Sequence, residues 1–241
     1  MSTVAPWVSE RTHQHRRGVY ADVGVPMNRN LAILILVGGA AFGCTHAAAQ
    51  PDIAASIYGT FSGTTTGNNI VQSPANAAGV LLEVREIKNP LVGFEGTYSY
   101  NRADQGYRLY ALPLDCPTPT SGACGVVSVL VPNNAHEITG DWIVSIKLAN
   151  LRPFALAGGG LLLNQPSSAP ANATTLGTTM SATKGVLVYG GGLDWQLVPH
   201  IGLRFQYRGN VYSAPALTTV FTSSGAFVHT AEPVVGIYFK L

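Results

Sequence analysis

The sequence predicts an all-β fold, an eight-stranded antiparallel up-and-down transmembrane β-barrel, from three observations. Several segments alternate strictly between apolar and polar residues, as strands with two different faces do. The connections between these segments are long and short in turn. A short apolar stretch near the start has the form of an export signal. Together these features predict that the apolar faces point outward into lipid and the polar faces point inward.

The composition indicates that much of the surface meets something other than water. Charged residues make up 11% of the 241 residues, whereas a typical soluble domain has roughly 25%. From Gln50 onward the chain has ten basic and ten acidic residues, so the formal net charge of +2 belongs to the residues before it. A neutral chain has no basic field for nucleic acid, and we expect no nucleic-acid partner.

The first 49 residues divide into two predicted parts. Residues 1–26 are polar and have no core pattern, so we expect a non-native or disordered upstream extension; a genuinely long leader is the alternative. Residues 27–49 have the form of a signal peptide, with a basic start, an apolar core over 31–37 and a small-residue cleavage site at 47–49. The apolar core is shorter than the roughly 20 residues of a spanning helix. The predicted barrel domain is therefore 50–241.

The chain has three cysteines, of which Cys44 falls in the predicted signal peptide. Cys116 and Cys124 lie eight positions apart in a segment rich in Pro, Thr and Gly. An exported protein meets an oxidising compartment, so we expect a disulfide between them. A metal site is the alternative, but no His or further Cys lies at ligand spacing.

Eight segments of the barrel domain are predicted strands. The clearest is 201–208, where apolar side chains alternate with Gly202, Arg204, Gln206 and Arg208. The other seven are 52–61, 79–87, 92–101, 137–148, 153–163, 184–195 and 230–241. The alternation is weakest in 153–163, which contains a run of three glycines, and glycine runs of this kind indicate close backbone approach and curvature in a barrel wall.

The connections between the predicted strands alternate in length. The short turns are 88–90, 149–152 and 197–200, and the long loops are 62–76, 102–135, 164–183 and 209–228. Outer-membrane barrels have short periplasmic turns and longer external loops. Because eight is an even number, both ends of the domain lie with the short turns, and we expect the termini in the periplasm.

This plan resembles the small OmpA/OmpX-type eight-stranded outer-membrane β-barrel domain family over the whole of 50–241. The similar blocks are 93–100, 188–195, 229–233 and 236–239. The family usually ends in an aromatic residue that the insertion machinery recognises, whereas this chain ends in Leu241. The resemblance implies a cell outer membrane location, with outer-membrane lipid, lipopolysaccharide and the insertion machinery as partners. It implies no catalytic residue, cofactor or metal.

The predicted inward faces carry charges of both signs. They contain six acids and five bases: Glu83, Arg85, Glu95, Glu137, Asp141, Lys147, Asp194, Arg204, Arg208, Glu232 and Lys240. A buried charge without a partner is costly, so we expect one salt-bridge network that plugs the lumen, centred on Arg204 and Arg208. Placement across the turns and the last loop predicts three facing pairs, namely Asp194 with Arg204, Arg208 with Glu232, and Glu83 with Glu95.

The expected function is a structural or surface-interaction role, with no enzymatic activity and an unknown extracellular ligand. A narrow porin-like channel is an alternative, although eight strands leave an interior that side chains can just fill. A lipid-modifying outer-membrane enzyme is another, since His229 lies near Ser223 and Ser224 in the sequence. Inward charges disfavour a soluble lipocalin-type pocket. The apolar faces also carry aromatic residues towards the strand ends, as membrane girdles do: Tyr98, Tyr100, Trp142, Tyr189, Trp195 and Tyr207.

Overall fold

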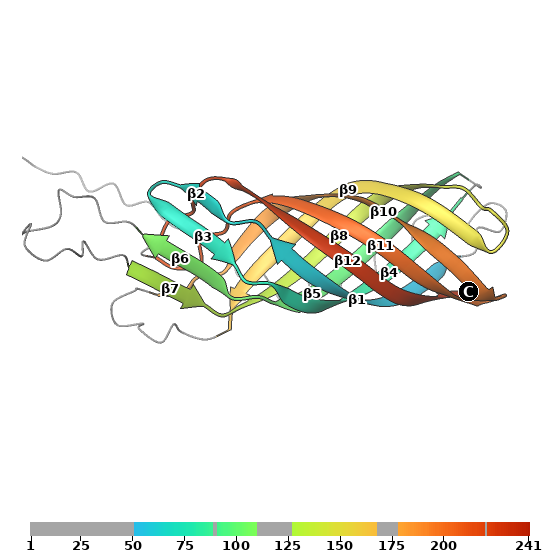
Figure 1. The fold of residues 1–241 in the computed structure, drawn as a ribbon, viewed down its shortest axis with the longest axis horizontal. Helices are drawn as coiled ribbons and strands as arrows, with labels where there is room; N and C mark the ends of the chain where they lie inside the picture. Colours follow the sequence, from blue (N-terminus) through green and yellow to red (C-terminus); the bar gives the residue numbers. More distant parts are fainter. Residues whose placement is uncertain (1–50, 89–90, 110–126, 168–177, 220) are drawn as a thin grey trace, which may run out of the picture. The chain divides into compact units, whose positions relative to one another are not determined.

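The computed structural model describes residues 51–88, 91–109, 127–167, 178–219 and 221–241 (Figure 1). The predicted signal peptide, the segment before it, Cys116 and Cys124 all lie outside these residues, so those expectations stay predictions. None of the described residues belongs to a helix that is long and apolar enough to cross a membrane.

The eight predicted strands close into an antiparallel barrel, which confirms the fold class. Their bounds are β1 (Asp52–Ser62), β4 (Ala77–Ile87), β5 (Val92–Arg102), β8 (Asn133–Ser145), β9 (Leu151–Pro166), β10 (Ala182–Val198), β11 (Ile201–Ser213) and β12 (Phe227–Lys240). Each barrel strand pairs with the barrel strands that come before and after it in the sequence, and β1 pairs with β12 to close the ring. We call the end of the barrel with the short β4–β5, β8–β9 and β10–β11 connections the turn side, and the opposite end the loop side.

Four further strands form a second sheet that the sequence did not predict. They are β2 (Thr65–Gly67), β3 (Ile70–Pro74), β6 (Gln105–Leu109) and β7 (Val127–Val131), paired in the order β2-β3-β6-β7. The expectation of plain loops over 62–76 and 102–135 was therefore wrong. Figure 1 shows this sheet beyond the loop side of the barrel. Asn68 and Asn69 join β2 to β3 with φ of 48° and 59°, a conformation that asparagine tolerates in two-residue hairpin turns.

The two faces of the barrel strands alternate as predicted. On β1, Ser56 is 5% exposed whereas its neighbour Ile57 is 66% exposed. The same change of exposure from one residue to the next runs along β5, β8 and β11. The polar set therefore faces the lumen, and the apolar set covers the outside of the barrel.

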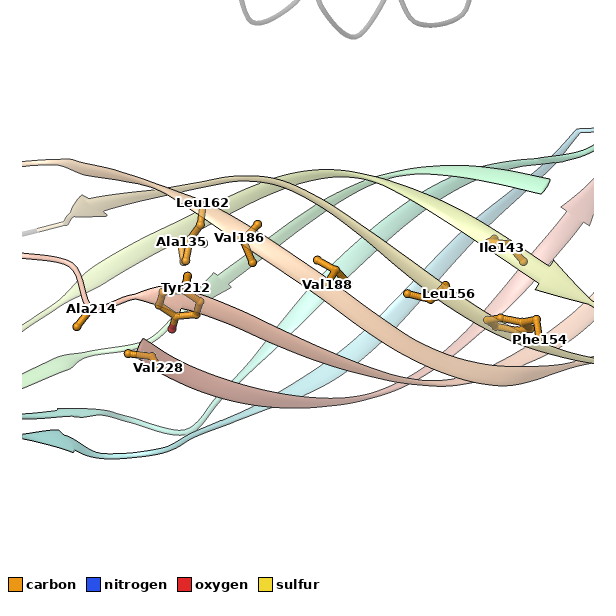
Figure 2. Close-up of a cluster of buried hydrophobic side chains, with 10 residues drawn as sticks. All are labelled: Ala135, Ile143, Phe154, Leu156, Leu162, Val186, Val188, Tyr212, Ala214 and Val228. Carbon is orange, nitrogen blue, oxygen red and sulfur yellow. The ribbon is translucent and has the colours of Figure 1, made fainter. Parts of the chain in front are cut away.

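The lumen is polar on one wall and largely apolar on the other. Figure 2 shows the buried side chains of the apolar wall, most of them on β8, β9 and β10: Ala135, Ile143, Phe154, Leu156, Leu162, Val186, Val188, Tyr212, Ala214 and Val228. The sequence did not predict this wall. Side chains fill the interior of a small barrel, and where they pack against one another they need not be polar.

Candidate functional site

Six buried charged side chains gather in the turn-side part of the lumen, and we call them the Arg204 cluster. They come from five strands, and each is at most 3% exposed: Asp52, Glu83, Arg85, Glu95, Asp194 and Arg204. The register places each of them within a few residues of a short turn or of the first strand's start. Inward positions near the turns of neighbouring strands converge on the same level of the lumen, which brings these six together.

Arg204 is the centre of its cluster. Its Nε lies 2.8 Å from Oδ1 of Asp194, which the register places directly opposite on β10, as expected. Its other guanidinium nitrogens lie 2.9 Å from Asp52 Oδ1, 3.4 Å from Glu83 Oε2 and 3.7 Å from Glu95 Oε2. The guanidinium thus joins carboxylates from β1, β4, β5 and β10 across the lumen.

Arg85 links two of these carboxylates, those of Glu95 and Asp194, a second time. Its Nη2 lies 2.6 Å from Glu95 Oε2, and its Nη1 lies 3.0 Å from Asp194 Oδ2. The guanidinium carbon of Arg85 is 4.1 Å from the ring centroid of Phe154, which reaches across from the apolar wall. A cation over an aromatic face is stabilised by the ring electrons. The turn-side lumen is therefore filled by charge on one wall and by an aromatic ring on the other.

The predicted facing of Glu83 and Glu95 was wrong. In the register of β4 with β5, Glu95 faces Arg85 and Glu83 faces Thr97. Ile87 pairs with Gly93, so the β4–β5 connection is centred one residue later than predicted. When the centre of a hairpin shifts by one residue, each residue of one strand faces a residue two positions away from the expected one. Glu95 therefore faces Arg85 in an ion pair, and not Glu83 in a like-charge pair.

A second group, which we call the Arg208 cluster, lies further from the turns. It consists of Arg208, Glu137, Asp141 and Glu232, each at most 4% exposed. Nη2 of Arg208 lies 3.1 Å from Glu137 Oε1, whose other oxygen accepts a hydrogen bond of 2.9 Å from Asn210. Thr139 Oγ1 lies 3.3 Å from the same Arg208 nitrogen and donates to Asp141 Oδ2 at 2.9 Å.

Arg208 faces Glu232 in the register of β11 with β12, as expected. The Arg208 guanidinium nevertheless forms no ion pair within 4.0 Å with the Glu232 carboxylate in the described part of the chain. Several buried polar atoms of this region have no hydrogen-bond partner within the described part of the chain: Asp141 Oδ1, Gln206 Nε2 and Oε1, Arg208 Nε and Nη1, Asn210 Oδ1 and Glu232 Oε2. The Arg204 cluster also has such atoms, namely Glu83 Oε1, Arg85 Nη2 and Glu95 Oε1, but none of them belongs to its central arginine, whereas Arg208 leaves two nitrogens without a hydrogen-bond partner among the described residues.

The expected single network takes the form of two clusters. In the described part of the chain, no ion pair within 4.0 Å joins the Arg204 cluster to the Arg208 cluster. Their closest connection in the register is Glu95 on β5 opposite Asp141 on β8. Both of these are acids, so the clusters meet through like charges.

The predicted balance of charge in the lumen was also wrong. Lys147 lies beyond the end of β8 and is exposed, and Lys240 is half-buried, with Nζ donating to Gln196 Oε1 at 2.7 Å. Asp52, which sequence reasoning missed, is buried and occupies the inward position just before Ile53. The buried charges described in the lumen are therefore seven carboxyl groups and three guanidinium groups.

The loop-side sheet has its own apolar core. Ile70, Tyr107, Val129 and Val131 on the sheet pack with Leu217 and Phe221 of the β11–β12 connection. Tyr107 Oη donates to Pro215 O at 2.9 Å and accepts from Leu217 N at 3.2 Å. Burial raises the pKa of Tyr107, because a phenolate would lose its hydration there.

Two further contacts fix the same connection to the β2–β3 hairpin. Thr65 Oγ1 lies 3.0 Å from Ser224 Oγ, and Asn68 Nδ2 donates to Ser223 O at 3.0 Å. A Cβ on Gly67 would collide with the backbone oxygen of Ser224, so a glycine is needed for this close approach. The β11–β12 connection is thus part of a packed unit with the loop-side sheet.

His229 and the nearby serines do not come together as a catalytic pair. His229 Nε2 is hydrogen-bonded to the hydroxyl of Tyr189. Ser223 Oγ donates to Ala214 O at 2.6 Å, and Ser224 Oγ pairs with Thr65. Neither hydroxyl has the histidine as a base, so this geometry lends no support to the enzymatic alternative.

Comparison with known proteins gives the fold. No protein-family model matches the chain, and no curated protein matches it significantly. The crystal structure of Neisserial surface protein A (NspA) is similar with a TM-score of 0.51 and 14% identity, covering 82% of this chain and 100% of that one. The outer membrane protein OprG from Pseudomonas aeruginosa is similar with a TM-score of 0.54 and 10% identity, covering 80% of this chain and 96% of that one. The chain therefore has the fold of the eight-stranded outer-membrane β-barrels.

Proposed function

We propose that this protein spans the bacterial outer membrane as a plugged β-barrel with a structural or surface-interaction role. The observation that carries the proposal is Arg204, which is 0% exposed and has four carboxylates from four other strands within 4.0 Å. Groups held in this way occupy the space that a solute would need in a barrel of eight strands. A closed barrel with an apolar outer face is the form of β-structure that can lie in the hydrocarbon region of a membrane.

The proposed orientation places the turn side and both ends of the barrel domain in the periplasm. Short periplasmic turns and longer external connections are the rule for outer-membrane barrels, which supports this orientation. Outer-membrane lipid, lipopolysaccharide and the insertion machinery would then be its partners. The loop-side sheet with the β11–β12 connection would face the outside of the cell as the surface for an extracellular ligand.

A narrow channel is the second candidate, and the Arg208 cluster is the observation that favours it. Its spare donors and acceptors, among them Arg208 Nε and Glu232 Oε2, could be hydrated. A water-filled path would also have to pass the Arg204 cluster, whose guanidiniums are paired with carboxylates from opposite sides of the lumen. We therefore favour the plug over the channel.

Two measurements test the proposal. The protein should be found in the outer-membrane fraction and should migrate differently on SDS gels before and after heating, as folded barrels do. Recovery from the soluble periplasm alone would contradict a membrane barrel. In planar bilayers the native protein should give no conductance steps. Steps of uniform size would contradict the plugged barrel and favour the channel.

A further inference from the structure

The outward face of the barrel differs chemically between its two ends. All outward tryptophans, together with Phe94, Phe205 and Phe239, lie within four residues of the turn-side end of their strands. All outward tyrosines and histidines of the barrel strands lie six or more residues from that end: Tyr98, Tyr100, His136, Tyr189, Tyr207 and His229. Tyrosine hydroxyls and imidazoles on the outward face of the described barrel strands are thus confined to the half nearer the loop side, whereas the turn-side half carries indole and phenyl rings.

Charge on the outward face of the barrel strands occurs only at the two ends of the barrel. Among the outward positions of the eight barrel strands, the charged residues are Glu86, next to the last residue of β4, and Arg102, the last residue of β5. The surface between them is apolar or aromatic, as a band in contact with hydrocarbon should be. Arg102 therefore marks the loop-side limit of that band.

Three successive rows across β5, β8 and β9 show the change from hydrocarbon to a polar boundary. The first outward row is Tyr98, Ile138 and Leu161; the second is Tyr100, His136 and Leu163; the third is Arg102, Asn134 and Gln165. Each row is more polar than the one before it. We define the rim patch as Tyr98, Tyr100, Arg102, Asn134 and His136.

The side chains of the rim patch are already arranged with respect to one another. His136 Nδ1 is 2.9 Å from the hydroxyl of Tyr98, and its ring centroid is 5.0 Å from that of Tyr100. The hydroxyl of Tyr100 donates to Asn134 Oδ1 at 3.3 Å. These contacts orient the imidazole and the Asn134 amide side by side, next to the exposed guanidinium of Arg102.

Lipid tails cannot satisfy this set of groups. Amide, imidazole and guanidinium donors are costly in hydrocarbon unless they find acceptors. Within the described residues Arg102 has no ion pair, and the rim patch contains no carboxylate. Its chemistry matches a ligand that offers anionic oxygens and hydroxyl groups at the level where the hydrocarbon ends.

We infer that the rim patch binds the phosphorylated saccharide head group of a glycolipid in the leaflet on the loop side. The inference rests on the proposed function, because it needs the barrel to lie in a membrane. The Arg102 guanidinium would hold a phosphate, and Asn134 and His136 would bond to phosphate or sugar oxygens. Tyr98 and Tyr100 would lie at the junction between the head group and the acyl chains, where their amphipathic rings are favoured.

The test uses the full chain inserted into nanodiscs of phosphatidylcholine that contain a minor fraction of bisphosphorylated lipid A. Lipid retained after detergent extraction is counted by native mass spectrometry. The same experiment is run with dephosphorylated lipid A and with phosphatidylglycerol. The native protein should retain bisphosphorylated lipid A in preference to both, and the Tyr100→Phe/Arg102→Gln double variant should retain roughly tenfold less, because a hydrogen bond to a charged group is worth about a decade of affinity.

Tyr207→Phe is the matched control, since Tyr207 is an outward tyrosine on β11, away from the rim patch. It should retain as much lipid A as the native protein. Equal retention of all three lipids by the native protein, or undiminished retention by the double variant, would overturn the head-group site while heat-modifiable migration of the same sample still shows an inserted barrel. A chain that inserts into none of the nanodiscs would overturn the proposed function and the site with it.

Discussion

Arg204 Nε lies 2.8 Å from Asp194 Oδ1 across the β10–β11 hairpin, and the two side chains are 0% and 4% exposed. The same guanidinium reaches Asp52 on β1, which is separated from β11 by β12 in the barrel. A bond across the lumen ties strands together that share no backbone hydrogen bonds. The pair with Asp194 is thus local, whereas the pair with Asp52 holds the closed barrel.

Replacing Arg204 should therefore strongly destabilise the barrel. The Arg204→Ala variant leaves several buried carboxylates without their cation, and breaking a buried pair in this way costs about 3–5 kcal/mol of unfolding free energy. Urea midpoints in lipid vesicles measure the change. Lys184→Ala is the control, because no ion pair of Lys184 is recorded in the described structure. Equal midpoints for the two variants would mean that the lumen holds no network.

The two clusters should respond in opposite ways to the loss of an acid. Glu95→Gln removes the partner of Arg85 at 2.6 Å and should destabilise the protein by about 1–3 kcal/mol. Glu232→Gln removes a buried acid from a group where three carboxyls surround Arg208, and Arg208 keeps Glu137 at 3.1 Å. This second change should be neutral or should stabilise the barrel by about 1 kcal/mol. Comparable losses in both variants would show that Glu232 is needed as a counter-charge.

Tyr107→Phe should loosen the β11–β12 connection and leave the barrel unchanged. The substitution removes the hydroxyl that bonds to Pro215 O and Leu217 N, at about 1–3 kcal/mol of local stability. Limited proteolysis should cut within 214–226 faster than in the native protein, with the urea midpoint of the barrel unaltered. Tyr207→Phe, on the outer face of the barrel, is the control. An unchanged cleavage rate would mean that the apolar contacts alone hold this connection.

The predicted disulfide between Cys116 and Cys124 is tested on exported protein. A tryptic digest under non-reducing conditions should contain the two cysteine peptides as a linked pair. Closing a short loop of this length contributes about 2–4 kcal/mol in the chain-entropy model. Finding both thiols free in the exported protein would contradict the predicted disulfide.

The sequence was sufficient for the barrel because most strands alternate between apolar residues on the outside and polar residues in the lumen. Ile57 and Ser56 show this contrast within one strand. It was insufficient for β2, β3, β6 and β7, which have three to five residues each, too few for alternation to stand out. The paired asparagines at 68 and 69 were the one local signal of a hairpin there.

The candidate site was predictable only in part. Alternation was enough to place Arg204 and Arg208 inward, and the tight β10–β11 turn placed Asp194 opposite Arg204. The sequence did not fix the centre of the β4–β5 turn to within one residue. For this reason Glu83 was predicted as the partner of Glu95, whereas the partner in the structure is Arg85. Contacts across the lumen, such as Arg85 with the Phe154 ring, depend on closure of the barrel and have no counterpart in local sequence.

The last prediction concerns the glycine that makes room for that ring. A Cβ on Gly192 would lie 2.7 Å from Cζ of Phe154 and would collide with the backbone oxygen of Phe205. Gly192→Ala should therefore push the ring away from Arg85, or distort β11, and cost about 1–3 kcal/mol, as overpacking does.

Gly185→Ala on the same strand is the matched control, because a Cβ there meets no atom within 4 Å. Both variants replace a glycine of β10 by alanine, so the change in strand propensity is the same in both and cancels in the comparison. A lower urea midpoint for Gly192→Ala alone would show that the methyl group is not accommodated between the Phe154 ring and β11. Equal midpoints would mean that the lumen has room to absorb the methyl group, and the plug would then be looser than the contacts of Arg85 and Arg204 imply.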